Sequence, residues 1–455
     1  MMREFTLGEL AQAVKGELRG ADASVRGVTI DSRRVEPGDL FVALPGARVD
    51  GHDFLDAVAA AGAVAAVVSR DVETTLPIIR VGDTRQALAD LAAHNRRAYR
   101  GTLVGITGSS GKTTAKTLVA AVLSRGGETL ATEGNLNNEI GVPLTLLRLK
   151  PSHRFAVVEM GAGRRGDIGW LCDFARPDVA LLLNAMPAHL EGFGTLEDVV
   201  EAKGEIYQGL RGQGTAIINA DQPWAARWRV RAQGARILDY ALEGTAAIRA
   251  RDIRSRGMAG SSFIASTPEG DTPVRLALPG RHNVSNALAA MAIGLACGLG
   301  LAEITAGLAE VRPVTGRGAL SRGPRGCTLV DDTYNANPGS VRAAIDLLTD
   351  CAPRRWLALG AMLELGAESE RMHREIGEYA REQGLEAFVG VGEALRGAVD
   401  VFGDGGQWFA DCDSAAVALR DQLQAGDTLV IKGSRGSAME RLLTALAEDS
   451  SEAGD

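Results

Sequence analysis

Short apolar runs that alternate with helix-like stretches constrain the fold of this chain more than any other feature. Between residues 83 and 311, the runs TLVGITG, RFAVVEMG, DVALLLNA and GTAIINAD each carry polar residues at their carboxyl ends. Continuous runs of this kind are typical of strands buried on both faces of a parallel sheet, and ligands gather at the carboxyl ends of such strands. The sequence therefore predicts an α/β fold with a candidate site at that edge.

The length of 455 residues predicts several domains, because one hydrophobic core rarely becomes that large. We expect three α/β domains, over residues 1–82, 83–311 and 312–455. A second series of apolar runs predicts another doubly wound sheet in the last of them, beyond the Gly- and Arg-rich stretch EVRPVTGRGALSRGPRG. Within the central domain, the alternating polar patch 246–278 predicts antiparallel strands.

Charge and composition exclude several classes of protein. The net charge of −8, without a basic stripe, argues against a nucleic-acid-binding protein. The cysteines are odd in number, scattered and never spaced as C-x-x-C, so we expect a reducing compartment and neither disulfides nor a metal knuckle. No stretch approaches the ~20 apolar residues that span a bilayer, and no signal-peptide core is present. A cytoplasmic protein is expected.

The segment GITGSSGKTT, residues 105–114, follows the first apolar run and precedes a helical stretch. It departs from the common pattern G-x-x-x-x-G-K-[ST], because Ile106 stands where that pattern has its first glycine. Glycines at 108 and 111 still allow backbone N–H groups to converge on phosphate oxygens at a helix start. Lys112 is expected to bridge the outer phosphates and Thr113 to bind Mg²⁺. The alternative is an ordinary turn between a strand and a helix.

Three residues with ionisable side chains are candidates at or near the same sheet edge. Glu159 ends an apolar run beside the phosphate loop, where a Mg²⁺ ligand is expected, although a helix cap or a salt-bridge partner would also fit. His189 follows the next run, and a lone histidine is more often structural. Lys203 lies in the amphipathic stretch LEDVVEAKGEIYQGL, and on its own it is interpreted as a solvated lysine paired with Glu201 or Glu205.

Amides and charged residues further along the chain form a second group of candidates. Asn283 and Asn286 lie three apart on one helical face, where they could read an adenine or contact phosphates, or one could be an N-cap. Asp332 follows the run CTLVD and could bind ribose hydroxyls, and Asn337 is expected to cap a helix. Arg317 is either a phosphate-reaching finger or a solvated loop arginine.

Taken together, the motifs resemble the Mur ligase family across all three predicted domains. The matching segments are TGSSGKTT, EGNLNNEIGVPLTLL, VEMG, AHLEGF, EAKGEIY, GRHNVSNALAA, DDTYNANPGS and VIKGSRG. The phosphate loop of the family reads T-G-[ST]-x-G-K-T-[ST], which residues 107–114 match. The resemblance implies an N-terminal domain that holds a UDP-sugar, a central ATPase domain, and a Rossmann-like C-terminal domain with acceptor and ATP contacts.

The resemblance also implies a role for each residue that matches a family motif. Implied catalytic residues are Lys112, Glu159, His189, Lys203 and Arg317. ATP contacts are implied for Gly108, Ser109, Ser110, Gly111, Lys112, Thr113, Thr114, Asn283, Asn286, Arg317 and Asp332. Two Mg²⁺ ions are implied at Thr113, Glu159, His189 and Lys203, the last as a carbamate formed with CO₂. Substrate contacts are implied for Ser32, Arg33, Asn135, Asn137, Asn138, Tyr334, Asn335 and Asn337.

The activity implied by the resemblance is ATP-dependent amide-bond formation through an acyl phosphate. The segments YNANPGS and GNLNNEIG favour the family member that joins D-alanyl-D-alanine to UDP-N-acetylmuramoyl-tripeptide in peptidoglycan precursor synthesis. Alternatives are the tripeptide-forming ligase, a folate polyglutamate ligase and, more remotely, a P-loop NTPase that acts as a binding module. A monomer is expected, and the third residue of the peptide stays open between diaminopimelate and lysine.

Overall fold

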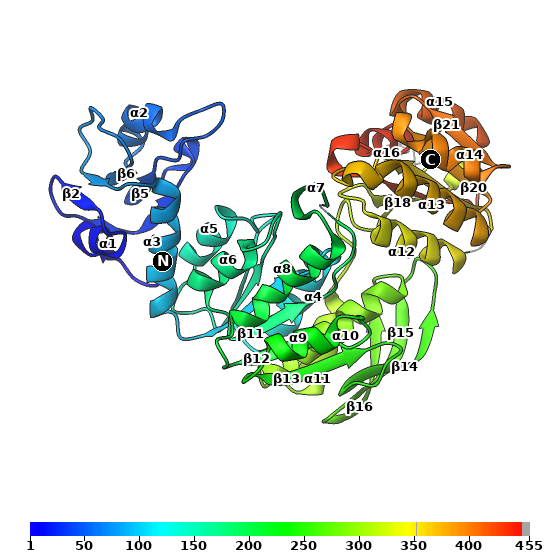
Figure 1. Ribbon diagram of the computed structural model, residues 1–455, viewed down its shortest axis with the longest axis horizontal. Helices are drawn as coiled ribbons and strands as arrows, with labels where there is room; N and C mark the ends of the chain where they lie inside the picture. Colours follow the sequence, from blue (N-terminus) through cyan, green and yellow to red (C-terminus); the bar gives the residue numbers. More distant parts are fainter. Residues whose placement is uncertain (189, 352, 448–455) are drawn as a thin grey trace, which may run out of the picture.

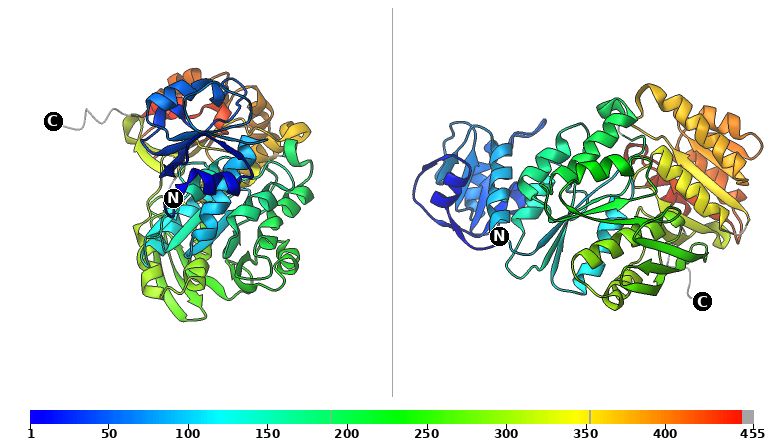
Figure 2. Two further views of the ribbon diagram at one scale, coloured as in Figure 1. Left: turned by 90° about the vertical axis from the view of Figure 1, so that its left-hand side faces the viewer. Right: turned by 60° about the horizontal axis from the view of Figure 1, so that its bottom comes forward.

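The computed structural model describes residues 1–188, 190–351 and 353–447, which form three α/β units in a row. The N-terminal and C-terminal units lie at opposite ends of an elongated molecule, with the central unit between them (Figure 1). The two further views agree with this arrangement (Figure 2). The predicted α/β class is confirmed, because parallel strand pairs dominate the larger sheets. None of the helices in the described part of the chain is both long and apolar enough to cross a membrane.

The N-terminal unit is built on a five-stranded sheet of order β2-β7-β6-β5-β4, in which only β2 runs antiparallel to its neighbour. Its middle strands are buried on both faces, as their unbroken apolar sequences require. The elements are β1 (Phe5–Thr6), α1 (Leu7–Ala13), β2 (Glu17–Arg19), β3 (Ser24–Val25), β4 (Gly27–Thr29), β5 (Asp39–Val42), α2 (Leu55–Ala60), β6 (Ala65–Val68), β7 (Ile78–Arg80) and α3 (Thr84–Ala98).

The central unit contains a nine-stranded sheet of order β16-β15-β14-β13-β12-β11-β8-β10-β9. Strand pairs from β9 to β14 are parallel, and β14, β15 and β16 pair antiparallel, which confirms both sequence predictions for this region. The strands are β8 (Thr102–Thr107), β9 (Thr129–Ala131), β10 (Phe155–Glu159), β11 (Val179–Leu182), β12 (Thr215–Asn219), β13 (Arg236–Ala241), β14 (Ile248–Ser255), β15 (Ser261–Thr267) and β16 (Gly270–Leu276).

Helices cover the central sheet and carry several candidate residues. They are α4 (Lys112–Ser124), α5 (Gly141–Leu147), α6 (Asp167–Ala175), α7 (Leu190–Phe193), α8 (Leu196–Gln208), α9 (Ala225–Arg231), α10 (Arg281–Ala296) and α11 (Leu301–Glu310). Helix α4 packs against α10 and α11 through apolar residues such as Val122 and Ile304. This packing places the start of α10 beside the start of α4, so the two helix N-termini meet at the candidate site.

The C-terminal unit has a six-stranded sheet of order β17-β18-β22-β19-β20-β21, parallel except for the edge strand β17. Because β18 and β22 are paired in register, Asp332 and Lys432 lie side by side at their carboxyl ends. The elements are β17 (Ala319–Arg322), β18 (Thr328–Asp332), α12 (Pro338–Thr349), β19 (Arg355–Gly360), α13 (Ser369–Glu382), β20 (Ala387–Val391), α14 (Arg396–Phe402), β21 (Gly406–Phe409), α15 (Cys412–Gln422), β22 (Thr428–Lys432) and α16 (Glu440–Leu446).

A buried arginine fastens α3 to the central sheet. The Arg96 guanidinium donates to the carbonyl oxygens of Ala175 (2.8 Å), the last residue of α6, and of Arg176 (2.9 Å), which follows it. It also donates to Asp178 Oδ2 (3.0 Å), and the same oxygen accepts from the backbone N–H of Leu103 in β8 (2.8 Å). Arg96 thereby holds the strand that leads into the phosphate loop.

We predict that Arg96→Met lowers the free energy of unfolding by about 2–4 kcal/mol, because the carbonyl groups of Ala175 and Arg176 lose their side-chain donor and Asp178 loses its charged partner. Urea denaturation followed by circular dichroism measures the change. Arg97→Met is the matched control, since Arg97 is the exposed neighbour on the same helix. Equal stability of the two variants would contradict this role of Arg96.

Candidate active site

The phosphate loop is held in shape by the loop that follows β11. The Asn184 side-chain oxygen accepts from the N–H of Ser110 (2.9 Å), and its amide donates to the Ser110 carbonyl (3.1 Å). The Asn184 carbonyl accepts from the N–H of Ser109 (3.0 Å), and the Ser109 hydroxyl donates to the Met186 carbonyl (3.1 Å). Contacts within the protein therefore hold the loop conformation.

Gly111 stands at the N-cap of α4 with a φ of 80°, a left-handed conformation that favours glycine. A Cβ atom at this position would lie 3.2 Å from Oδ1 of Asn286, a tight contact that would require the Asn286 side chain to shift. The Asn286 amide donates to Asn283 Oδ1 (3.2 Å), and the Asn283 amide donates to the Pro279 carbonyl (2.7 Å). Both amides are thus brought to the phosphate loop, and neither caps α10, whose N-cap is Gly280.

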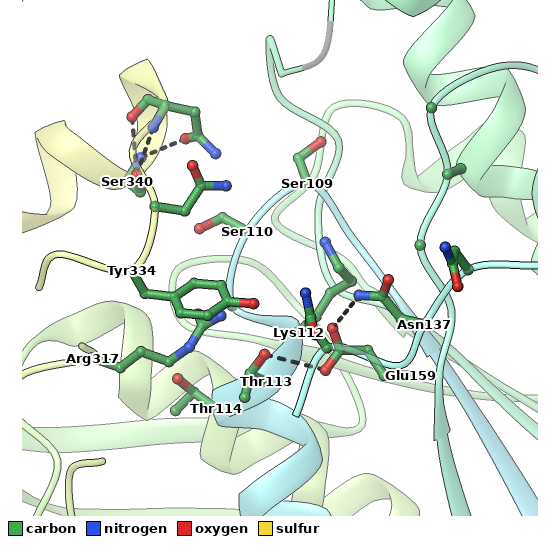
Figure 3. Close-up of a pocket in the computed structure, with 18 of the residues that line it drawn as sticks. Ser109, Ser110, Lys112, Thr113, Thr114, Asn137, Glu159, Arg317, Tyr334 and Ser340 are labelled. Carbon is green, nitrogen blue, oxygen red and sulfur yellow. Dashed lines mark hydrogen bonds between the residues drawn. The ribbon is translucent and has the colours of Figure 1, made fainter. Parts of the chain in front are cut away.

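Glu159 is buried, with 2% of its surface exposed, and both its oxygens have partners. Oε1 accepts from the Asn137 amide (2.8 Å), and Oε2 accepts from the Thr113 hydroxyl (3.2 Å), as Figure 3 shows. Lys116 Nζ lies 3.3 Å from Oε2. Burial by itself raises the pKa of Glu159, but Lys112, Lys116 and the Asn137 amide outweigh it and hold the pKa below its usual value. The carboxylate is therefore ionised at neutral pH.

The oxygen ligands around Glu159 suit Mg²⁺, an ion that usually keeps several water ligands, better than a metal bound by protein side chains alone. Thr113 and Glu159 offer two hard oxygen ligands next to the phosphate loop. Among the described residues, no group of three or more His, Cys, Asp or Glu side chains could hold a metal. Mg²⁺ is commonly bound by one or two carboxylates together with substrate phosphates, so the site suits Mg²⁺ that arrives with a nucleotide.

Lys112 and Arg317 supply positive charge on the two sides of the phosphate loop. Lys112 Nζ donates to the Gly108 carbonyl (2.8 Å). Burial lowers the pKa of Lys112, the Glu159 carboxylate acts in the opposite direction, and Arg317 lowers the pKa further. The Arg317 guanidinium lies 4.0 Å from the centre of the Tyr334 ring, which stacks on it (Figure 3). Arg317 is therefore oriented by an aromatic side chain rather than solvated freely.

The C-terminal unit faces the phosphate loop with an ion pair. Lys432 Nζ donates to Asp332 Oδ2 (2.6 Å) and to the Asn335 carbonyl (3.0 Å), and the Lys432 side chain is 3% exposed. The neighbouring Asp331 accepts from the N–H of Gly316 (2.7 Å), which fixes the segment that carries Arg317. The geometry holds Asp332 in place at the carboxyl end of β18.

The start of α3, the central unit and the C-terminal unit line one cavity of about 1470 Å³. Asp83, Arg85 and Gln86 contribute from the start of α3 at the N-terminal side. Most of the predicted site residues line it, namely Ser109, Ser110, Gly111, Lys112, Thr113, Thr114, Asn135, Asn137, Asn138, Glu159, Asn283, Asn286, Arg317, Asp332, Tyr334, Asn335 and Asn337. Asn337 also caps α12, because its side-chain oxygen accepts from the Ser340 N–H (2.9 Å), as expected.

Other predicted residues lie elsewhere. Ser32 and Arg33 belong to a 3-10 turn (Ser32–Arg34) of the N-terminal unit, outside this cavity, and Arg33 pairs with Asp31 at 2.8 Å. Lys203 also does not line the cavity. The interpretation of Lys203 as a solvated lysine is wrong, because Lys203 is 1% exposed on α8 and its Nζ lies 5.7 Å from the centre of the Phe193 ring. Burial, and then the positive charge of Lys112, lowers the pKa of Lys203 well below its usual value. His189 lies outside the described residues.

Sequence reasoning missed three residues of this site: Lys116, Asn184 and Lys432. Asn184 and Lys432 each stand at or just beyond the carboxyl end of a buried apolar run, the signal that drew attention to Glu159 and Asp332. Lys116 lies one helical turn after Lys112, so its side chain follows the same face of α4. These three residues could therefore have been found from the sequence, as polar residues at strand ends or as the residue four positions after the loop lysine.

Comparison with known proteins decides the family. Three family models match: the Mur ligase middle domain over residues 106–294, the Mur ligase glutamate ligase domain over 316–435, and the Mur ligase family catalytic domain over 24–96. The chain belongs to the Mur ligase family. It is 43% identical over 451 residues to the UDP-N-acetylmuramoyl-tripeptide–D-alanyl-D-alanine ligase of Escherichia coli K12, covering 98% of this chain and 99% of the relative. This Mur ligase is thus an ATP-dependent enzyme that forms amide bonds.

Solved structures agree with the assignment. A crystal structure of MurF from Acinetobacter baumannii is 35% identical with a TM-score of 0.92, covering 97% of this chain and 98% of that chain. The MurF ligase of Thermotoga maritima, in complex with ADP, is 30% identical with a TM-score of 0.83, covering 92% and 97%. The curated ligase of Haemophilus influenzae that bears the same name as the E. coli protein is 38% identical, covering 98% of this Mur ligase and 99% of the relative.

We predict that Lys112→Ala reduces ligation by roughly a thousandfold or more, since it removes a positive charge from the transferred phosphoryl group. The fold should be retained, because Lys112 donates only to its own loop in this structure. Phosphate release measures activity, circular dichroism checks the fold, and the exposed Lys150→Ala is the control. Near-normal turnover of Lys112→Ala would refute the assignment.

Proposed function

We propose that this Mur ligase joins the amine of D-alanyl-D-alanine to the terminal carboxylate of UDP-N-acetylmuramoyl-tripeptide while ATP becomes ADP and phosphate. The supporting observation is that one cavity brings a phosphate loop together with the start of α3 and with residues of the C-terminal unit. The chain-long identity to ligases named for this reaction adds the substrate class.

The first step transfers the γ-phosphoryl group from ATP to the carboxylate. A carboxylate oxygen attacks the γ-phosphorus, ADP leaves, and an acyl phosphate forms. Two anions must approach each other, so the site has to supply positive charge at fixed positions. We propose that Lys112 and Arg317 supply it, that the loop N–H groups hold the phosphates, and that Asn283 and Asn286 contact the nucleotide. Asp332 would accept from a ribose hydroxyl.

In the second step, the neutral amine attacks the carbonyl carbon of the acyl phosphate. Phosphate leaves from the tetrahedral intermediate with the former carboxylate oxygen as its bridging atom, and the nitrogen loses one proton. Water must be kept out, because it would hydrolyse the acyl phosphate. The position of the cavity between the units suits exclusion of water by domain closure.

Bound Mg²⁺ would neutralise phosphate charge at Thr113 and Glu159, the oxygen ligands that fit it. We propose a second Mg²⁺ near His189 and a carbamate on Lys203. The burial of Lys203 supports the carbamate, since a desolvated amine is neutral and neutral amines add CO₂.

For the sugar-nucleotide substrate, we propose that Ser32 and Arg33 hold the UDP end. Asn135, Asn137 and Asn138 would contact the peptide near the phosphate loop. Tyr334, Asn335 and Asn337 would contact the acceptor side of the cavity. Asn137 already has a positioning role, because its amide donates to Glu159. The proposed domain limits, 1–82, 83–311 and 312–455, assign these contacts to separate units.

The acceptor specificity provides the direct test. With ATP and the tripeptide nucleotide, phosphate release should depend on D-alanyl-D-alanine and fall to background with L-glutamate or with diaminopimelate as acceptor. Efficient use of either single amino acid would favour a tripeptide-forming or polyglutamate-forming ligase. Release without any acceptor would favour a simple NTPase.

Oxygen-18 placed in the substrate carboxylate should appear in the released phosphate, because the acyl phosphate transfers that oxygen. Mass spectrometry of the phosphate measures the transfer. Unlabelled phosphate would exclude the acyl-phosphate route, whichever acceptor is used.

We expect a carbamate signal on the wild-type protein in ¹³C-bicarbonate at neutral pH, because burial lowers the pKa of Lys203 and so favours the neutral amine that adds CO₂. Carbon-13 NMR measures it. The signal should disappear in Lys203→Met and remain in Lys150→Met, which changes an exposed lysine. A wild-type spectrum without it would remove the carbamate from the proposal.

A further inference from the structure

Lys116 is buried beside the carboxylate at the centre of the site, yet it does not line the cavity. Its Nζ lies 3.3 Å from Glu159 Oε2 and donates to the Gly134 carbonyl at 2.8 Å. Its side chain is 7% exposed, and that of Glu159 is 2% exposed. Lys116 therefore acts on any ligand through the groups that it contacts and not by touching the ligand.

These contacts join three segments that are separate in sequence. Lys116 belongs to α4, Glu159 ends β10, and Gly134 lies in the loop 132–140 that carries Asn135 and Asn137. The loop closes the circle, because the Asn137 amide donates to Glu159 Oε1 at 2.8 Å. With Thr113 on Oε2, the Glu159 carboxylate is fixed in one orientation.

The positive charge of Lys116 also affects how strongly Glu159 attracts a metal ion. A single carboxylate attracts a divalent cation, but an ammonium group next to its oxygen cancels most of that attraction in a poorly solvated site. In the described part of the chain, Glu159 belongs to no group of three or more His, Cys, Asp or Glu side chains that could hold a metal. The phosphates of a nucleotide would supply the missing negative charge.

We propose that Lys116 is a positioning residue that makes divalent-metal binding at Glu159 depend on nucleotide. Without phosphate in the site, the Lys116 ammonium group balances the negative charge of the Glu159 carboxylate. It also keeps this carboxylate directed at Thr113, in the orientation that binds the metal–nucleotide complex. The inference rests on the proposed role of Glu159 as a metal ligand. It predicts that loss of Lys116 changes metal affinity and turnover in opposite directions.

Titration with Mn²⁺ alone, followed by electron paramagnetic resonance of the free ion, tests this on the full chain. Lys116→Met should bind Mn²⁺ about tenfold more tightly than the wild type without nucleotide, since a cation beside the ligand is gone. Addition of ADP should make the Mn²⁺ affinities of Lys116→Met and the wild type more similar. Turnover should fall at least tenfold, because Lys116 no longer connects Glu159 to the loop that contains Gly134. Unchanged or weaker Mn²⁺ binding would overturn the proposal, since a purely structural role predicts no gain in affinity.

Three variants complete the design. Lys116→Arg retains the charge and should keep Mn²⁺ binding as weak as in the wild type. Lys432→Met removes another buried ion pair of the same cavity, away from Glu159, and should not tighten Mn²⁺ binding. If thermal unfolding shows that Lys116→Met does not fold, Lys116→Gln, which can still donate to Gly134, carries the same prediction.

Glu159→Gln separates this inference from the proposed function. If Glu159→Gln leaves Mn²⁺ binding with ADP unchanged, the metal role of Glu159 fails, and the inference fails with it. If Glu159→Gln weakens that binding but Lys116→Met gives no gain without nucleotide, only the role of Lys116 fails.

Discussion

A carboxylate buried at the end of a central strand is the constraint on which the site depends. An isolated buried carboxylate would cost several kcal/mol, so Glu159 is stable only with its partners in place. These partners are Thr113 and Lys116 from α4, Asn137 from a loop, and the charge of Lys112. The contacts that compensate this one charge therefore hold together the phosphate loop, the end of β10 and the loop that carries Asn137.

The same principle holds in other parts of the molecule, within the C-terminal unit and between α3 and the central sheet. Asp332 is fixed by Lys432, Asp331 holds the backbone next to Arg317, and Arg96 ties α3 to the strand that leads into the phosphate loop. Each is an ion pair or a charge-assisted hydrogen bond between segments far apart in sequence. A reaction that brings two anions together needs charges at fixed positions, and these contacts fix them before substrate arrives.

The fold was largely predictable because its strands are buried on both faces. The runs that became β8, β10, β11 and β12 are continuous and apolar, so they could be recognised without any partner. Strands β9 and β17 were not predicted, since they are short, and β17 is an exposed edge strand with the sequence ALSR. Strand β13, RILDYA, starts with exposed residues and lacks such a run.

The candidate site was only partly predictable, and Lys203 shows why. Its neighbours Glu201 and Glu205 made a solvated helix pair the natural interpretation, yet Glu201 pairs with Arg231 of α9, and Glu205 accepts from the backbone N–H groups of Gly166 and Gly169. Lys203 itself is buried, with its Nζ 5.7 Å from the centre of the Phe193 ring of α7. Periodicity places a residue on a helix face, but only packing decides whether that face meets solvent.

The sequence alone determined that a glycine loop joins a buried strand to a helix, and that polar residues end the neighbouring strands. Those features follow from local backbone freedom and from the alternation of apolar runs, which are properties of contiguous segments. The tertiary structure alone decided that Lys116, Asn184 and Lys432 belong to the site. Their roles arise from single charges and amides placed within about 3 Å of partners distant in the chain, and hydrogen bonds over such distances depend on how whole units pack.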